Sequence, residues 1–144
     1  MKIYRVEAEY TNITFPLIQD LLQKALKRGL GEITLDQVKH YCRTGQQQLW
    51  IGLDEDTKDI PLAFTTEIIT YATGQKHLAI HLVGAKNHTI KKWVNEWSEP
   101  VEDFCKDNNV KYIQTFSRDG WLRAIKHLGY KKYYTSQVKE IKYD

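Results

Sequence analysis

The sequence predicts an α/β protein of the α+β layered kind, in which helices pack on a mixed, mostly antiparallel β-sheet. Apolar residues recur at helical spacing in several segments and form short β-rich runs in several others. Consecutive strand-like runs joined by polar turns indicate an antiparallel meander, whereas the alternation of strand and helix later in the chain indicates a crossover connection. The two patterns together are typical of a mixed sheet with helices on it.

The first half of the chain is expected to begin with a strand, continue through two helices and then form the meander. The expected helices are 15–29 and 34–45, and the expected strands are 2–9, 47–56, 60–71 and 76–84. The first helix has Pro16 near its start and Gly29 as its stop. Thr34 is placed to cap the second helix, and Gly45 to end it.

The second half is expected to alternate helix and strand. The expected helices are 89–105 and 120–129, and the expected strands are 110–116 and 131–141. Apolar side chains from Ile90 to Cys105 follow the stripe of a long helix that is buried on one side. Pro100 is expected to kink this helix or to restart it at Ser98, and Gly129 to end the last helix before a closing strand.

Length and composition limit the class of protein further. With 144 residues, no linker and no repeat, the chain is expected to be a single domain, 1–144. Cys42 and Cys105 are far apart in sequence and predict reduced thiols, hence a cytoplasmic protein. No apolar stretch approaches the roughly 20 residues that span a bilayer. The net charge of +3 is mild and its charges are interleaved, so nucleic acid is not the expected partner.

One stretch of the second half resembles a known family. "GWLRAIKHLGYKKYYTSQVKEI" contains Gly-Trp-x-Arg followed by Leu-Gly-Tyr, and it is preceded by "IPLAFTTEI" and "LAIHLVGA". With the order of the elements, these motifs resemble the GNAT-type N-acetyltransferases. More narrowly, they are similar to small GNAT-like proteins that tailed bacteriophages encode. The likeness covers roughly residues 47 to 141, and the earlier part matches in element order alone.

The resemblance implies that acetyl-CoA or coenzyme A is the cofactor. In this family the strands that correspond to 76–84 and 110–116 are parallel neighbours that splay apart, and the pantetheine arm pairs with the freed backbone. The start of the next helix would hold the pyrophosphate. The residues that the resemblance assigns to the cofactor are Leu82, Val83, Gly84, Ala85, Lys86, Asn87, His88, Thr89 and Arg118.

The sequence also departs from the family pattern. The phosphate loop retains Gly84-Ala85 without the preceding Arg or Gln and without the second glycine. In the family, a tyrosine four residues before the glycine of the Leu-Gly-Phe motif acts as the general acid. Ile125 occupies this position here. No general acid is therefore identified. Three nearby tyrosines could supply the acid, although each could equally be an ordinary core or surface residue: Tyr130, Tyr133 and Tyr134.

Two side chains are candidates for the general base. Glu67 and His81 would project from central strands close to the splay, where a base must take a proton from the attacking amine. Each could equally be a satisfied structural residue. His77 has the same parity as His81 but lies roughly 13 Å away along the strand, too far to share one metal ion. No metal site is expected.

Two functions from different classes remain open. The first is an N-acyltransferase that moves an acetyl group from acetyl-CoA to a small-molecule or peptide amine. The second is a non-catalytic GNAT-like phage protein with a structural, virion-internal or host-interaction role, located in the host cytoplasm or the virion. The incomplete phosphate loop and Ile125 favour the second function, whereas Gly84 and the overall pattern favour the first.

Overall fold

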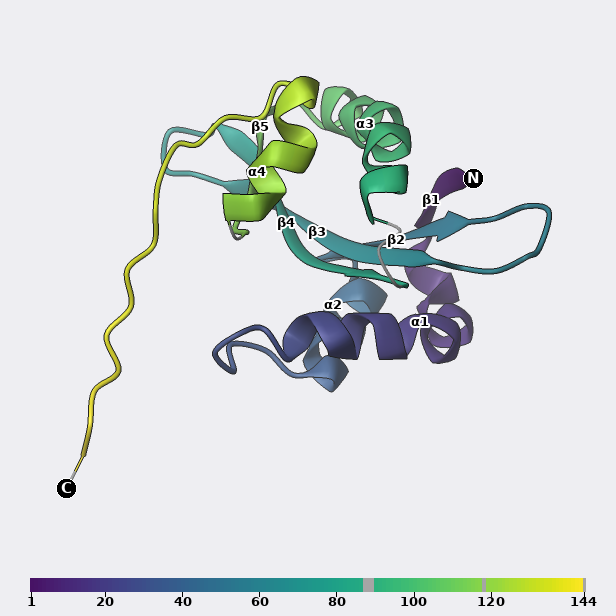
Figure 1. Cartoon of the computed structure of the whole chain (residues 1–144), viewed down its shortest axis with the longest axis horizontal. Coiled ribbons are helices and arrows are strands. Elements are labelled where there is room, and N and C mark those ends of the chain that lie inside the picture. The colour runs from purple at the N-terminus through teal and green to yellow at the C-terminus, as the bar shows by residue number, and fades with distance from the viewer. Residues whose placement is uncertain (87–89, 118, 144) are drawn as a thin grey trace.

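A five-stranded mixed sheet forms the centre of the computed structural model, which describes residues 1–86, 90–117 and 119–143 (Figure 1). The strands lie in the order β1-β2-β3-β4-β5; the first three pairs are antiparallel and the β4–β5 pair is parallel. Their bounds are β1 Lys2–Val6, β2 Gln48–Leu53, β3 Leu62–Thr70, β4 Lys76–Ala85 and β5 Val110–Thr115. The meander and the crossover that the sequence predicts are both confirmed.

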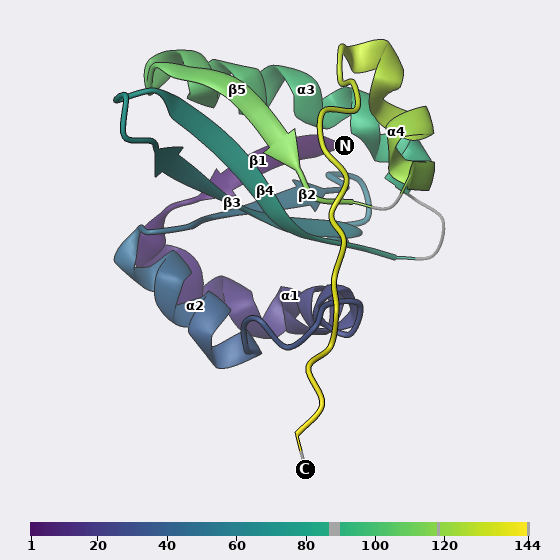
Figure 2. The ribbon, with the colours of Figure 1, turned by 90° about the vertical axis from the view of Figure 1, so that its left-hand side faces the viewer.

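Helices cover both faces of the sheet. Their bounds are α1 Thr11–Leu26, α2 Leu35–Thr44, α3 Ile90–Asp107 and α4 Asp119–Ile125, with short 3₁₀ segments at Ala8–Tyr10 and Lys126–Leu128. The helices α1 and α2 pack on one face, and α3 and α4 on the other (Figures 1 and 2). Each face has its own core: Phe15, Ile18 and Leu22 of α1 contribute to the first, and Trp93, Trp97 and Val101 of α3 to the second. The predicted α/β layered class is confirmed.

Local signals explain where α2 begins and ends. The Thr34 side chain accepts a hydrogen bond from the Gln37 backbone N–H, and the Gln37 side chain accepts one from the Thr34 N–H, which together make a capping box. Gly45 ends the helix with a φ of 82°, a left-handed conformation that glycine adopts without a steric penalty. Both ends lie where the sequence predicts them.

The two prolines within helices behave differently from expectation. The helix α1 begins at Thr11, well before Pro16, and α3 runs from Ile90 to Asp107 with Pro100 inside it. The helix therefore does not restart at Ser98. The alternative expectation, a kink at Pro100, stays a prediction. Packing explains the difference for α3, because Trp97 and Val101 on either side of the proline are both buried in the core and hold the helix against the sheet.

The predicted closing strand at 131–141 is also wrong for this chain in isolation. Residues 131–143, called here the C-terminal tail, form neither helix nor strand and extend away from the sheet (Figure 1). A strand needs a partner for its backbone groups, and within the described residues the tail pairs with none. Gly129 ends the preceding 3₁₀ turn with a φ of 98°, as predicted.

The parallel pair splays apart as the sequence predicts. Pairing of β4 with β5 begins at Lys76 and Val110 and ends at Ile80 and Thr115, whereas β4 continues to Ala85 along β3. The two strands diverge beyond this last pair (Figure 2). From His81 to Ala85, the edge of β4 that faces β5 therefore has no pairing with it.

Two further sequence expectations concern the cysteines and membranes. Cys42 and Cys105 are both free and buried, and burial raises the pKa of the Cys42 thiol to about 12 and that of Cys105 to about 11. In the part of the chain that the structure describes, no helix is long and apolar enough to cross a membrane.

Candidate functional site

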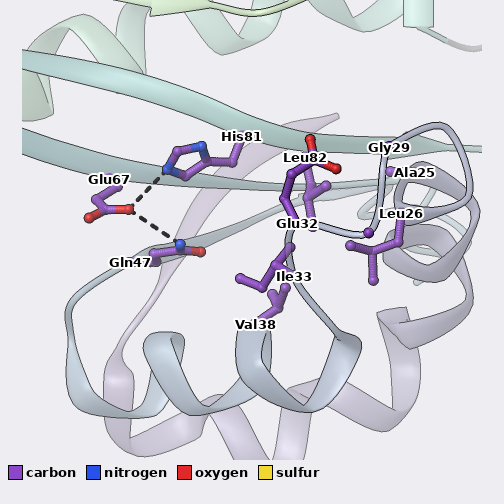
Figure 3. Close-up of a pocket in the computed structure, with 11 residues that line it drawn as sticks. Ala25, Leu26, Gly29, Glu32, Ile33, Val38, Gln47, Glu67, His81 and Leu82 are labelled. Carbon is purple, nitrogen blue, oxygen red and sulfur yellow. Dashed lines mark hydrogen bonds and ion pairs between the residues drawn. The ribbon is translucent and has the colours of Figure 1, made fainter. Parts of the chain in front are cut away.

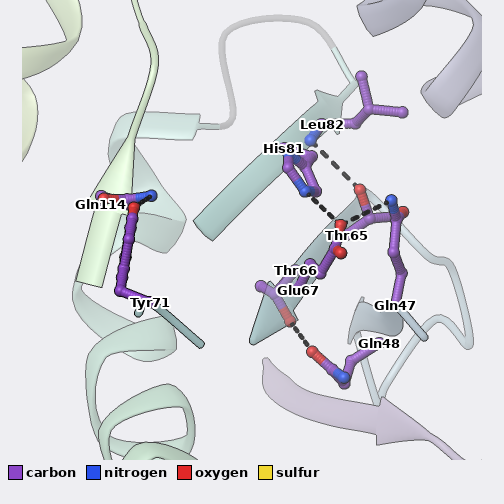
Figure 4. A network of polar contacts seen from close by, with 9 residues as sticks. All are labelled: Gln47, Gln48, Thr65, Thr66, Glu67, Tyr71, His81, Leu82 and Gln114. Carbon is purple, nitrogen blue, oxygen red and sulfur yellow. Dashed lines mark hydrogen bonds and ion pairs between the residues drawn. The ribbon is translucent and has the colours of Figure 1, made fainter. Parts of the chain in front are cut away.

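A β-bulge lies where β4 separates from β5. Phe64 pairs with Val83 and Thr66 pairs with Ile80, so Thr65 of β3 faces two residues of β4, His81 and Leu82. The Leu82 N–H donates a hydrogen bond of 3.2 Å to the Thr65 hydroxyl (Figure 4). Bulges redirect side chains and are frequent beside active sites. Here the bulge brings His81 and Leu82 together at one pocket.

The two predicted base candidates contact each other. His81 Nε2 lies 3.0 Å from Glu67 Oε1, and Gln47 Nε2 donates to the same carboxylate oxygen over 3.3 Å (Figures 3 and 4). Gln47 is almost wholly buried, and the Glu67 and His81 side chains are partly exposed, at 24% and 32%. The buried amide therefore anchors a carboxylate, and the carboxylate holds an imidazole that still reaches solvent.

This hydrogen bond assigns the imidazole tautomer. A carboxylate only accepts hydrogen bonds, so His81 Nε2 must carry the proton that it donates to Glu67. The other ring nitrogen, Nδ1, then has a free lone pair when the ring is neutral. The arrangement gives His81 the geometry of a general base and Glu67 that of the group that orients it.

A pocket of about 260 Å³ lies beside this pair, between the loop after α1 and the bulge (Figure 3). Glu67, His81 and Gln47 line one side, and Glu32 lies on another (Figure 3). The apolar side chains of the lining are Ala25, Leu26, Ile33, Val38 and Leu82. The described lining thus combines an apolar wall with carboxylates, and it contains neither lysine nor arginine.

The structure places the predicted cofactor residues along the splay. Leu82, Val83, Gly84 and Ala85 form the part of β4 that has no pairing with β5. The stretch therefore suits a pantetheine arm, whose amides can bond to a released strand edge. Lys86 follows directly, but its Nζ contacts Asp59 Oδ1 at 2.5 Å and holds the pKa of that carboxyl below its usual range. The remaining predicted positions, Asn87, His88, Thr89 and Arg118, lie outside the described residues.

Gly84 has a structural role that sequence reasoning missed. A Cβ at this position would lie 2.1 Å from the Leu21 carbonyl oxygen and 2.5 Å from its carbonyl carbon. Only glycine allows α1 to pack this closely on β4. The glycine that resembles part of the phosphate loop is thus required by helix packing, and its presence is no sign of a phosphate site.

Position 125, where the family has its general-acid tyrosine, has no group that could donate a proton. Ile125 is 2% exposed and belongs to the core between the sheet, α3 and α4. Tyr130 packs against the same core near Glu102 and Cys105, in the half of α3 farther from the splay, and burial raises its pKa. Tyr133 and Tyr134 belong to the exposed tail. None of the three phenols that the sequence offers is placed at the splay.

His77 belongs to a separate polar group. Its Nε2 lies 2.9 Å from Gln75 Oε1 and its Nδ1 lies 3.2 Å from Gln114 Oε1. Gln114 also donates to the Tyr71 hydroxyl over 3.3 Å (Figure 4). Among the described residues, no three histidine, cysteine or acidic side chains are grouped so that they could hold a metal ion.

Sequence reasoning found Glu67 and His81 but missed Gln47 and Glu32. Gln47 precedes β2, and its neighbours in sequence, Gln46 and Gln48, offer the same chemistry. The only sequence signal for Gln47 was that a polar residue precedes a strand expected to be buried. Glu32 lies in the loop after α1, directly after Gly31, where a carboxylate is ordinarily a solvated charge.

The layered sheet, the splayed β4–β5 pair and the helices on both faces define the fold of the GNAT-type N-acetyltransferases. No family model and no curated protein matches the chain by sequence. Solved structures do match, among them glucosamine-6-phosphate N-acetyltransferase from Arabidopsis thaliana, with a TM-score of 0.68 and 14% identity over 98% of both chains.

Two further solved structures have similar overlap. Ribosomal-protein-alanine N-acetyltransferase from Brucella melitensis biovar Abortus 2308 has a TM-score of 0.67 and 9% identity, over 98% of this chain and 100% of its own. An aminoglycoside acetyltransferase from an uncultured soil metagenomic sample, solved with sisomicin, has a TM-score of 0.66 and 12% identity, over 99% and 95%. At these identities the likeness establishes the fold, and the site must support the function.

Proposed function

We propose that this chain is an N-acyltransferase that transfers an acetyl group from acetyl-CoA to a small-molecule or peptide amine. The observation that carries the proposal is the position of His81. It is the first residue of β4 beyond the pairing with β5, it is oriented by Glu67, and it opens onto a pocket large enough for a small acceptor. A base at position 81 would lie where β4 and β5 begin to separate, next to the expected position of the thioester.

The residues of the splay fit coenzyme A in part. The backbone of Leu82 to Ala85 would hold the pantetheine arm as an added strand, since β4 has no β5 partner there. When bound, acetyl-CoA supplies the activated acyl thioester. Lys86 already contacts Asp59, so we expect its contribution to phosphate binding to be small and the affinity to lie in the micromolar to millimolar range.

The chain's own groups perform the proton transfer. An amine acceptor is largely protonated at neutral pH and must lose a proton before it can attack. His81 Nδ1 would accept this proton, directly or through one water. Glu67 then stabilises the imidazolium that forms, and Gln47 keeps Glu67 in place. Because Ile125 replaces the acidic tyrosine, we expect turnover roughly 10²-fold below that of an enzyme with a general acid.

Thiol release, followed with a disulfide reagent, tests the proposal. His81→Ala should lower kcat/KM by about 10²-fold, and Glu67→Gln should lower it less while shifting the acidic limb of the pH profile, where the base becomes protonated. His77→Ala is the matched control, because His77 lies on the same strand and face but bonds to Gln75 and Gln114. Equal rates for His81→Ala and the wild type would refute the assignment.

A second candidate function is a non-catalytic GNAT-like phage protein, acting in the virion or in the host cytoplasm. The burial of Ile125 in the core favours it, as does the packing role of Gly84, because both remove a functional reason for a family motif. Calorimetry separates the two proposals. Millimolar acetyl-CoA that produces neither binding heat nor thiol release, across a panel of amines, would support the scaffold and reject the enzyme.

A further inference from the structure

The pocket beside His81 carries information about the acceptor, and the inference drawn from it rests on the proposed acyltransferase function. Glu67 lies on one side of the pocket and Glu32 on another, and aliphatic side chains complete the lining (Figure 3). The Glu32 carboxylate is held in place, because the Leu30 N–H donates to its Oε1. A Cβ on Gly29 would come within 3.1 Å of the same oxygen, so the glycine lets it lie close to the loop.

The charges of the lining select for a cation. Among the described lining residues, the acidic side chains are Glu32 and Glu67, and no lysine or arginine is present to bind an anionic group. An acceptor with a carboxylate or a phosphate would bring a negative charge toward Glu32 and Glu67, at an electrostatic cost. An acceptor with two ammonium groups would have a partner at each end.

The size and the apolar wall limit what joins the two ammonium groups. The volume of about 260 Å³ corresponds to about nine water-sized groups, at roughly 30 Å³ each. Ala25, Leu26, Ile33 and Val38 offer hydrocarbon surface to a linker, and burial of methylene groups against such a wall is favourable. We propose that the acceptor is a short aliphatic diamine, with the reacting amine at His81 and the distal ammonium at Glu32.

Three amines of related structure test this specificity: cadaverine, pentylamine, which lacks the second ammonium, and lysine, which adds a carboxylate to cadaverine. The expected kcat/KM for cadaverine exceeds that for each of the others about tenfold. Glu32→Gln should reduce the cadaverine-to-pentylamine ratio about three- to fivefold, as for a partly exposed ion pair. Glu9→Gln, at an exposed site outside the pocket, should leave the ratio unchanged.

Binding without acetyl-CoA provides a second readout. Cadaverine should raise the melting temperature of the wild type more than pentylamine does, and Glu32→Gln should abolish the difference. Equal turnover and equal stabilisation by cadaverine and pentylamine would overturn the diamine assignment and leave the acyltransferase function standing. Absence of turnover with every amine, with no selective stabilisation, would instead count against the acyltransferase function itself.

Discussion

Replacement of Gly84 by alanine tests the packing of α1 on β4 most directly. The added Cβ would lie 2.1 Å from the Leu21 carbonyl oxygen, 2.5 Å from the carbonyl carbon and 3.1 Å from Cα. These are backbone atoms of α1, so no side-chain rotation can relieve the contact. The helix must move away from the sheet, which would loosen the buried contacts of Ile18 and Leu22.

The expected cost follows from this geometry. Overpacking in a core typically costs 1–3 kcal/mol, and the rigid neighbour places Gly84→Ala at the upper end, at about 3 kcal/mol. For a domain of this size, that corresponds to a fall in melting temperature of roughly 10 °C. Gly120→Ala is the matched control, because among the described residues no atom beyond its chain neighbours and its own helix backbone lies within 4 Å of the Cβ that it would add. Alanine also favours a helix there, by up to about 1 kcal/mol.

Urea unfolding followed by tryptophan fluorescence measures both variants. A free energy of unfolding for Gly84→Ala within about 0.5 kcal/mol of the wild type would show that α1 and β4 are less tightly packed than described. The same variant informs the functional question. If coenzyme A binding were lost while the stability remained unchanged, Gly84 would belong to a phosphate loop after all.

The remaining predictions concern the core. Ile125→Tyr should lower stability by about 1–3 kcal/mol through overpacking, without raising thiol release; a faster rate at unchanged melting temperature would contradict the burial of this position. Thr66→Val should cost about 1–3 kcal/mol in urea unfolding, because the buried Trp50 Nε1–H loses its acceptor at 2.9 Å, whereas Thr70→Val, at the exposed end of β3, should have little effect. Burial raises the pKa of the Cys42 thiol from 9.0 to about 12, so its contribution to stability is complete below pH 9 and is lost as the pH rises toward 12. Between pH 9 and 11 the wild type should therefore lose stability more steeply than Cys42→Ala, by up to about 1.4 kcal/mol per pH unit; parallel pH profiles would argue against a raised pKa.

The elements of this fold follow closely from local sequence patterns. The signals that define them act between residues a few positions apart, so all the interacting groups lie close together in the sequence. They are the helical spacing of apolar residues, the Thr34 cap and the glycines at 45 and 129. The parallel β4–β5 pair was also predictable, because a long helix between two strands requires a crossover connection. The expected order of the elements held up to the start of the tail.

The candidate site was predictable only in part. The sequence indicated that Glu67 and His81 lie on neighbouring central strands. Their contact depends on the register of β3 against β4 and on the bulge opposite Thr65. Gln47 joins them from the turn just before β2. A bulge and a register are settled by pairing between distant residues, and no local preference encodes them.

The role of Gly84 and the course of the tail show the same division. In the sequence, Gly84 resembles part of a phosphate loop, because the motif contains no information about the helix that packs on it. The tail has the composition of a strand, but composition cannot supply the partner that a strand requires. Before the tail, the sequence by itself determined which segments form helices and strands and in what order. Only the tertiary structure decided which side chains meet at the splay and why Gly84 must be glycine, because each of these depends on atoms that approach from distant parts of the chain.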